Sequence, residues 1–265
     1  MDTNPKRVID RFVEACQRDP RVVAAFLYGS HATGKADIHS DIDLGVITMD
    51  QSHDEFLAQR AEFVKLLGEA VFLEDFGMPE MVFAILADGV ELELAFGREG
   101  DFAHMAPGPF SSLVDKRGLL GHVTLRERQP DPHEQRENLR RLITWFWHDV
   151  SHFVTAMARG HLWWAYGQLE ALRRYCVSLA RLQHNFEASA GGDEPYFKVQ
   201  LDLPVEMLAP LAPTLVPLER EAIYTAGRSV IDFYRSLAPQ LAQAYGLSYP
   251  ATLERIILDR LDHVT

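Results

Sequence analysis

The most informative part of the chain is residues 29–43, which read GSHATGKADIHSDID. It follows a nearly continuous apolar run at residues 21–28, which predicts a buried strand. Residues 29–40 are rich in Gly, Ser, Thr and His, a composition typical of a loop. From Asp41 to Ile47, apolar residues alternate with Asp41, Asp43 and Gly45, which predicts a second strand. A strand, a Gly-Ser loop and a strand opening with Asp-x-Asp therefore frame a candidate site.

Asp41 and Asp43 carry the first candidate chemistry. Successive side chains on a strand point to opposite faces, so these two carboxylates share one face and repel each other. A divalent cation removes that repulsion, and Mg²⁺ usually takes one or two protein carboxylates and completes its shell with water and phosphate oxygens. Gly29 and Ser30 offer a backbone N–H and a hydroxyl to a terminal phosphate. Lys35 is a further candidate contact for the leaving phosphates, against the ordinary interpretation of a solvated loop lysine.

A third acid is expected on a later hairpin. Residues 81–86 and 90–96 predict two strands joined by Ala87-Asp88-Gly89, in which Asp-Gly is a strong turn signal. Glu91 and Glu93 lie together on the polar face of the second strand, opposite its apolar face. Either glutamate would complete a three-carboxylate site, and the alternation alone does not choose between them.

The rest of the chain predicts an α+β protein with a helical second half. Helices are expected at 5–18 and 54–67, residues 97–133 have little periodicity, and a looser segment covers 187–210. Four long helical patterns follow at 135–158, 161–185, 218–237 and 250–262. We therefore expect an N-terminal catalytic domain at residues 1–130, with a mixed β-sheet and flanking helices, and a C-terminal α-helical bundle at 131–265 for substrate binding and dimerisation.

The Gly-Ser pair, ten intervening residues, Asp-x-Asp and an acid on a later strand resemble the nucleotidyltransferase superfamily of DNA polymerase β type. The chain length and helical second half resemble antibiotic nucleotidyltransferases, those acting on lincosamides or aminoglycosides. The likeness to lincosamide nucleotidyltransferases is carried by residues 158–161 (ARGH), 170–174 (EALRR), 245–247 (YGL) and 253–257 (LERII). It is loose over residues 97–133 and 187–215.

This resemblance implies a nucleotidyl transfer with a role for each site residue. Asp41 and Asp43 would hold Mg²⁺ bridging the phosphates of ATP or another nucleoside triphosphate, and Gly29 and Ser30 would cradle the β- and γ-phosphates. The second acid can be Glu in the lincosamide enzymes, so Asp43 is a modest departure. A glutamate on the third strand would act as general base or third metal ligand. The family glutamate closely follows a hairpin turn, which favours Glu91, whereas a polymerase-like register allows Glu93.

Composition and net charge limit the classes of partner that this protein is expected to bind. Lys and Arg number 26 and Asp and Glu 38, a net charge of −12, which argues against a protein that neutralises nucleic-acid phosphates. An acidic protein suits amine-bearing acceptors such as lincosamides or aminoglycosides. The first residues lack the apolar core of a secretory signal and no run is long enough to cross a membrane, so a cytoplasmic protein is expected. The apolar surface of the long helices predicts a homodimer.

Other interpretations stay open. The same Gly-Ser and Asp-x-Asp site occurs in antitoxins that transfer AMP to a partner protein, in which case the helical half would bind protein.

His148 and His152, four apart on a predicted helix, have the spacing of a metal-binding pair, against the more ordinary interpretation of buried or substrate-lining histidines. The adjacent Trp163 and Trp164 cannot both point inward, so we expect exposed indoles, with Asp149 and Glu170 as acids near an aromatic cleft.

Overall fold

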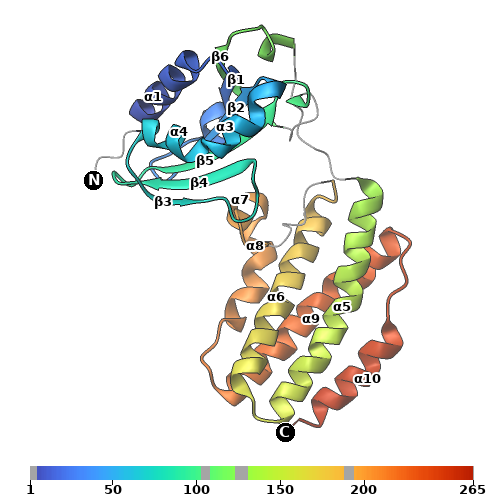
Figure 1. Cartoon of the computed structure of the whole chain (residues 1–265). Helices are drawn as coiled ribbons and strands as arrows, with labels where there is room; N and C mark the ends of the chain where they lie inside the picture. The colour runs from blue at the N-terminus through green and yellow to red at the C-terminus, as the bar shows by residue number, and fades with distance from the viewer. Residues whose placement is uncertain (1–4, 103–107, 123–130, 188–193, 265) are drawn as a thin grey trace. The chain divides into compact units, whose positions relative to one another are not determined.

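A computed structural model of the chain describes residues 5–102, 108–122, 131–187 and 194–264. Contacts divide the chain into two compact units, Met1–Arg128 and Gln129–Thr265. The division lies close to the predicted domain boundary between residues 130 and 131. Residues 123–130, which precede that boundary, lie outside the described residues. The first unit contains a sheet with helices and the second is helical, so the predicted α+β class is confirmed (Figure 1).

The first unit is built on a six-stranded mixed sheet. Its strands are β1 (Val22–Leu27), β2 (Ile42–Thr48), β3 (Ala70–Glu74), β4 (Met81–Leu86), β5 (Glu91–Arg98) and β6 (Ser111–Asp115). They lie in the order β3-β4-β5-β2-β1-β6. The central pair, β2 and β5, is parallel, and every other neighbouring pair is antiparallel.

Helices cover one face of this sheet: α1 (Pro5–Arg18), α3 (His53–Ala58) and α4 (Arg60–Leu67) (Figure 1). Their apolar side chains form one core with Ile42, Leu44, Leu92 and Leu94 of the two central strands. Because strand side chains alternate, the residues between these four point to the opposite face. Among the described residues, a small apolar cluster around Phe26 packs on that second face. Asp43 and Glu93 therefore lie on the face that the helices do not cover.

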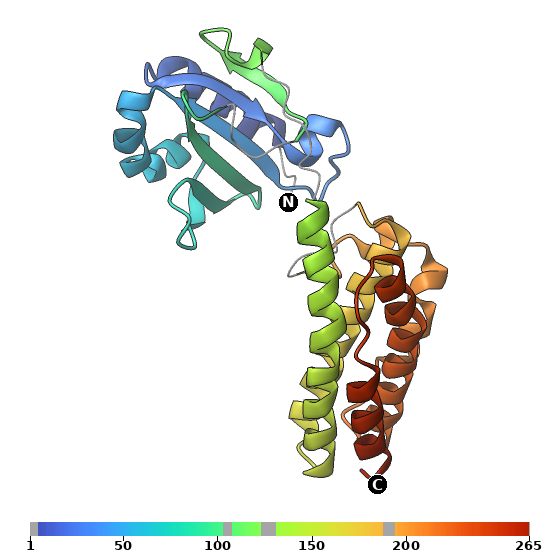
Figure 2. The same cartoon turned by 90° about the vertical axis from the view of Figure 1, so that its right-hand side faces the viewer.

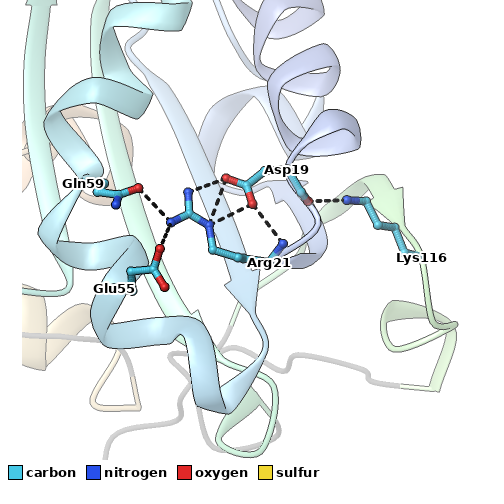
Figure 3. A network of polar contacts seen from close by, with 5 residues as sticks. All are labelled: Asp19, Arg21, Glu55, Gln59 and Lys116. Carbon is cyan, nitrogen blue, oxygen red and sulfur yellow. Dashed lines mark hydrogen bonds and ion pairs between the residues drawn. The ribbon is translucent and has the colours of Figure 1, made fainter.

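A polar network fastens the turn between α1 and β1 to the helical layer (Figure 3). The Arg21 guanidinium donates to Asp19 (2.7 Å), Glu55 (3.2 Å) and Gln59 (2.8 Å). Lys116 donates to the Asp19 carbonyl at 2.7 Å. The hydrogen bonds from the Arg21 side chain are the main cause that holds the pKa of the Asp19 carboxyl below its ordinary value, and the charge of Lys116 adds to the effect.

The second unit is a bundle of α5 (Pro132–Ala158), α6 (Leu162–His184), α9 (Arg220–Ala244) and α10 (Ala251–Asp262). Figure 2 shows these helices running side by side. Short helices α7 (Val199–Asp202) and α8 (Val205–Leu208) precede α9. The core is aromatic at its centre, where the buried rings of Phe146 and Tyr234 stack with centroids 3.5 Å apart. Among the described helices, none combines the length and apolar character needed to cross a bilayer.

The structure corrects several predicted elements. Residues 29–33 form a short helix, α2 (Gly29–Thr33), at the start of the predicted loop. The helix expected over 54–67 is divided at Gln59 into α3 and α4. In the described part of the region 97–133, β6 and a 3₁₀ turn at Leu120–His122 are present, and 3₁₀ turns also lie at Asp50–Ser52 and Ala209–Thr214. The third helix of the bundle runs seven residues past the predicted 237, through a proline at 239.

Candidate active site

The pairing of two parallel strands assembles three carboxylates. In the β2–β5 register, Asp43 is directly beside Glu93. Asp41 immediately precedes β2, and one carboxylate oxygen from each of Asp41, Asp43 and Glu93 lies within 4.8 Å of the other two. The apolar neighbours of these acids are buried under the helices, so the alternation of the strands holds the acids on the opposite face of the sheet.

Gly29 lies against this carboxylate cluster. Its φ of +62° is in the left-handed region, and a Cβ added there would fall 1.9 Å from Oδ2 of Asp43. The Tyr28 amide donates to the Asp43 carbonyl at 3.1 Å, which holds the end of β1 beside the start of β2. A glycine is therefore required at 29, because both the backbone conformation and the space exclude a side chain.

Ser30 and His31 each bring a buried polar atom to the first turn of α2. Ser30 Oγ and His31 Nε2 are buried and have no hydrogen-bond partner among the described residues. An unsatisfied buried polar atom costs about 1–3 kcal/mol, so a hydrogen-bonding ligand at this turn would be stabilised by both atoms. Together with three hard oxygen donors, these residues fit a divalent cation of the Mg²⁺ type with a phosphate group beside it.

Tyr28 is a site residue that the sequence analysis missed. Its hydroxyl donates to Oε1 of Glu93 at 3.2 Å. Burial and the charges of Glu93 and Asp43 raise the pKa of Tyr28 well above its ordinary value, so the hydroxyl stays protonated as a donor. Strand alternation could have indicated Tyr28, because this residue directly follows a strand and lies on the same face as Phe26, which is also the face that carries the acids.

Glu93 differs from an ordinary surface glutamate. Burial is the main cause that raises its pKa, the charge of Asp41 adds to the rise, and the hydrogen bond from Tyr28 opposes it. A carboxylate with a raised pKa is a stronger base than an exposed one, and such shifts cluster at functional sites.

Glu91 and Lys35 are not brought into the carboxylate cluster. Glu91 is exposed and pairs with Ile85 on β4, and the group of mutually close ligand atoms contains Glu93 instead. The geometry thus favours Glu93 over the sequence-based preference for Glu91, because the strand register, not the distance from the turn, decides which acid lies beside Asp43. Lys35 is exposed just after α2, and its amide donates to the Ser30 carbonyl at 3.0 Å. Its phosphate contact stays a prediction.

The helical unit exposes part of its aromatic cluster. Trp147 is fully buried, whereas Trp145, Trp163 and Trp164 are exposed. The expectation that Trp163 and Trp164 do not both point inward is therefore confirmed, and both are exposed. The carboxylate of Glu170 forms an ion pair with the buried guanidinium of Arg173, with an N–O distance of 2.6 Å, so its charge is neutralised within the helical unit. Both residues line a mostly apolar cavity of about 410 Å³.

Comparison with known proteins identifies the family. The family model described as streptomycin adenylyltransferase matches residues 3–264, nearly the whole chain. No curated protein matches. Among solved structures, an aminoglycoside 6-adenyltransferase from Bacillus subtilis is 14% identical over 99% of both chains, with a TM-score of 0.46. A nucleotidyltransferase-like protein from Exiguobacterium sibiricum 255-15 is 14% identical over 85% of this chain and 72% of its own (TM-score 0.40). The STING-associated CdnE c-di-GMP synthase from Capnocytophaga granulosa is 15% identical over 89% and 83% (TM-score 0.30).

The family match spans both the carboxylate cluster and the helical unit. It agrees with the resemblance carried by the Gly-Ser and Asp-x-Asp residues. The chain belongs to the streptomycin adenylyltransferase family and is a nucleotidyltransferase.

Proposed function

We propose that this enzyme transfers AMP from ATP to a hydroxyl group of an aminoglycoside- or lincosamide-type acceptor and releases pyrophosphate. The observation that carries the proposal is the cluster of Asp41, Asp43 and Glu93 beside Gly29 and the unsatisfied hydroxyl of Ser30. Of the two acceptor classes, the description of the family favours aminoglycosides.

Asp41 and Asp43 would hold Mg²⁺, which when bound neutralises charge on the attacking and leaving oxygens of an in-line displacement. Gly29 leaves room for a phosphate to approach the backbone closely, and Ser30 Oγ supplies a donor to it. The unsatisfied Nε2 of His31 is a second group on the same turn that a phosphate oxygen would satisfy.

Glu93 would accept the proton of the acceptor hydroxyl. Its raised pKa strengthens it as a base, and the hydrogen bond from Tyr28 fixes one carboxylate oxygen and leaves the other for the substrate. The bond that forms joins the acceptor oxygen to the α-phosphorus of ATP, and the bond that breaks releases pyrophosphate.

The electrostatic character of the chain agrees with these acceptors. Its net charge is −12, and aminoglycosides and lincosamides carry protonated amines at neutral pH. Long-range attraction between opposite charges raises the rate of encounter and falls with ionic strength.

The test is pyrophosphate release with each of the four nucleoside triphosphates and a panel of aminoglycosides and lincosamides. We expect release with ATP and one acceptor class, loss of release on chelation with EDTA, and recovery with added Mg²⁺. Asp41→Asn and Asp43→Asn should be inactive while remaining folded. Asp10→Asn, an exposed acid on α1, is the matched control and should retain full activity.

Two other outcomes would change the conclusion. Transfer of labelled AMP to a protein, with no release on any small acceptor, would replace this proposal by the antitoxin-type activity, for which the exposed Trp145 and Trp163 would be the first surface to test. Equal release by the wild type and Asp41→Asn would refute the role of the carboxylate cluster.

A further inference from the structure

Two histidines and an aspartate form a second cluster on α5, within the helical unit. One ligand-capable atom from each of His148, Asp149 and His152 lies within 4.8 Å of the other two. The rings of His148 and His152 are one helical turn apart, with centroids separated by 4.4 Å. Two nitrogens on one tetrahedral Zn²⁺ are about 3.3 Å apart, from bonds of about 2.0–2.1 Å, so a small side-chain rotation brings this pair to one ion.

Asp149 fixes the orientation of one of these rings. Its Oδ1 is 2.9 Å from Nδ1 of His148, and its Oδ2 accepts a hydrogen bond of 2.9 Å from the Tyr175 hydroxyl on α6. An ionised carboxylate only accepts hydrogen bonds, so Nδ1 of a neutral His148 carries the proton and Nε2 keeps its lone pair. This is the carboxylate–histidine arrangement that supports metal-binding imidazoles in many proteins.

The surroundings make this cluster both rigid and accessible. On the inner side of α5, Phe146, Val150 and Phe153 are fully buried and anchor the helix in the bundle. The side chain of His148 is 63% exposed, so an ion can reach it from solvent. Trp145 and Trp164 lie beside the cluster, with ring centroids 6.4 Å from His148 and 5.9 Å from His152.

We propose that His148 and His152 bind one divalent transition-metal ion, with Asp149 holding the His148 ring for it. Imidazole pairs suit Zn²⁺, Ni²⁺ and Cu²⁺, whereas Mg²⁺ prefers oxygen ligands such as the carboxylate cluster of the other unit. Two imidazoles leave coordination positions open for water or an external ligand. This site takes no part in the nucleotidyl transfer proposed above, and it stands or falls independently of that activity.

The first test is calorimetric titration of the untagged full-length chain with Ni²⁺ and then Zn²⁺, in an excess of Mg²⁺ that occupies the carboxylate cluster. The double variant His148→Gln/His152→Gln should bind the tightest ion at least tenfold more weakly than the wild type. Asp149→Asn should weaken it by about 10–100-fold, the usual cost of losing a supporting carboxylate. The matched control is His133→Gln, on the same helix near its first turn, which should bind like the wild type.

A second measurement locates the ion. Cu²⁺ quenches nearby indoles, so Trp145 and Trp164 should lose fluorescence as Cu²⁺ binds, and the loss should disappear in the double variant. Gln is a good helix former, so thermal unfolding should show the double variant folded. Equal affinity and stoichiometry in the wild type and the folded double variant would refute the site, as would quenching that survives both substitutions.

Discussion

The side chains of Glu91 and Glu93 share one face of β5, and replacing each by Gln separates their roles. Gln has nearly the size of Glu, and its carbonyl can still accept the hydrogen bond from Tyr28 that Glu93 receives at 3.2 Å. The substitution at Glu93 therefore removes the charge and the basicity while keeping the packing. The substitution at Glu91 removes the same charge two residues earlier, about 7 Å along the strand, from an exposed position.

The expected effects differ by orders of magnitude. Loss of a general base lowers kcat by about 10²–10⁴-fold, which is about 3–5 kcal/mol of transition-state stabilisation. A substitution at an exposed position such as Glu91 changes free energies by about 0.5 kcal/mol or less, so kcat should stay within about threefold of wild type. Glu93→Gln should not unfold the protein, because it relieves like-charge repulsion with Asp41.

The assay is steady-state pyrophosphate release with the acceptor identified by the panel, with kcat and KM measured for each variant. Thermal unfolding confirms that both variants fold. A Glu93→Gln enzyme with near wild-type kcat would refute the assignment of the base. A large loss of kcat in Glu91→Gln, with none in Glu93→Gln, would assign the general base to Glu91, as the sequence-based preference did.

Four further predictions test other parts of the structure. Tyr28→Phe removes the donor to the proposed base, so kcat should fall about tenfold with little change in the KM for ATP, and the pH optimum should move upward because the base is then easier to protonate. Gly29→Ala should abolish nucleotide transfer, whereas Gly34→Ala, with a similar φ of +70° but no atom of the described residues within 4 Å of the added Cβ, should cost about 1–2 kcal/mol of stability and retain activity. Because Arg21 lowers the pKa of Asp19, that carboxylate stabilises the fold fully above its unfolded pKa and loses the contribution as pH falls through its folded pKa. In urea unfolding, the wild type should thus exceed Asp19→Asn in stability at neutral pH but not in strong acid. Finally, light scattering should give about twice the 30.0 kDa of one chain if the homodimer predicted from the sequence forms, and a single-chain mass would exclude it.

Local pattern was enough to predict the two aspartates and the strands that frame them. Alternation over residues 41–47 placed Asp41 and Asp43 on one face, and the Asp-Gly turn predicted the hairpin that carries Glu93. Both signals act over a few residues, so a single sequence contains them.

The choice between Glu91 and Glu93 required information that local pattern lacks. Both lie on the same face of β5, and only the register against β2, a strand far away in the sequence, decides which is beside Asp43. The strand β6 was missed for another reason, since its sequence, Ser111–Asp115, is short and half polar and gives no period-two signal. The division at Gln59 has no Gly or Pro to mark it, and the apolar period of residues 56–67 runs through it.

Tyr28 and Glu93 are 65 residues apart, and the parallel pairing of β2 with β5 is what joins them. Closing so long a loop costs entropy before any contact repays it, so this pairing belongs to the slow part of folding. A chain still emerging from the ribosome holds Gly29, Ser30 and the two aspartates long before β5 is synthesised. Nucleotide binding would therefore begin only after β5 has paired with β2. ATP would bind the native state in preference to partly folded chains and so stabilise it.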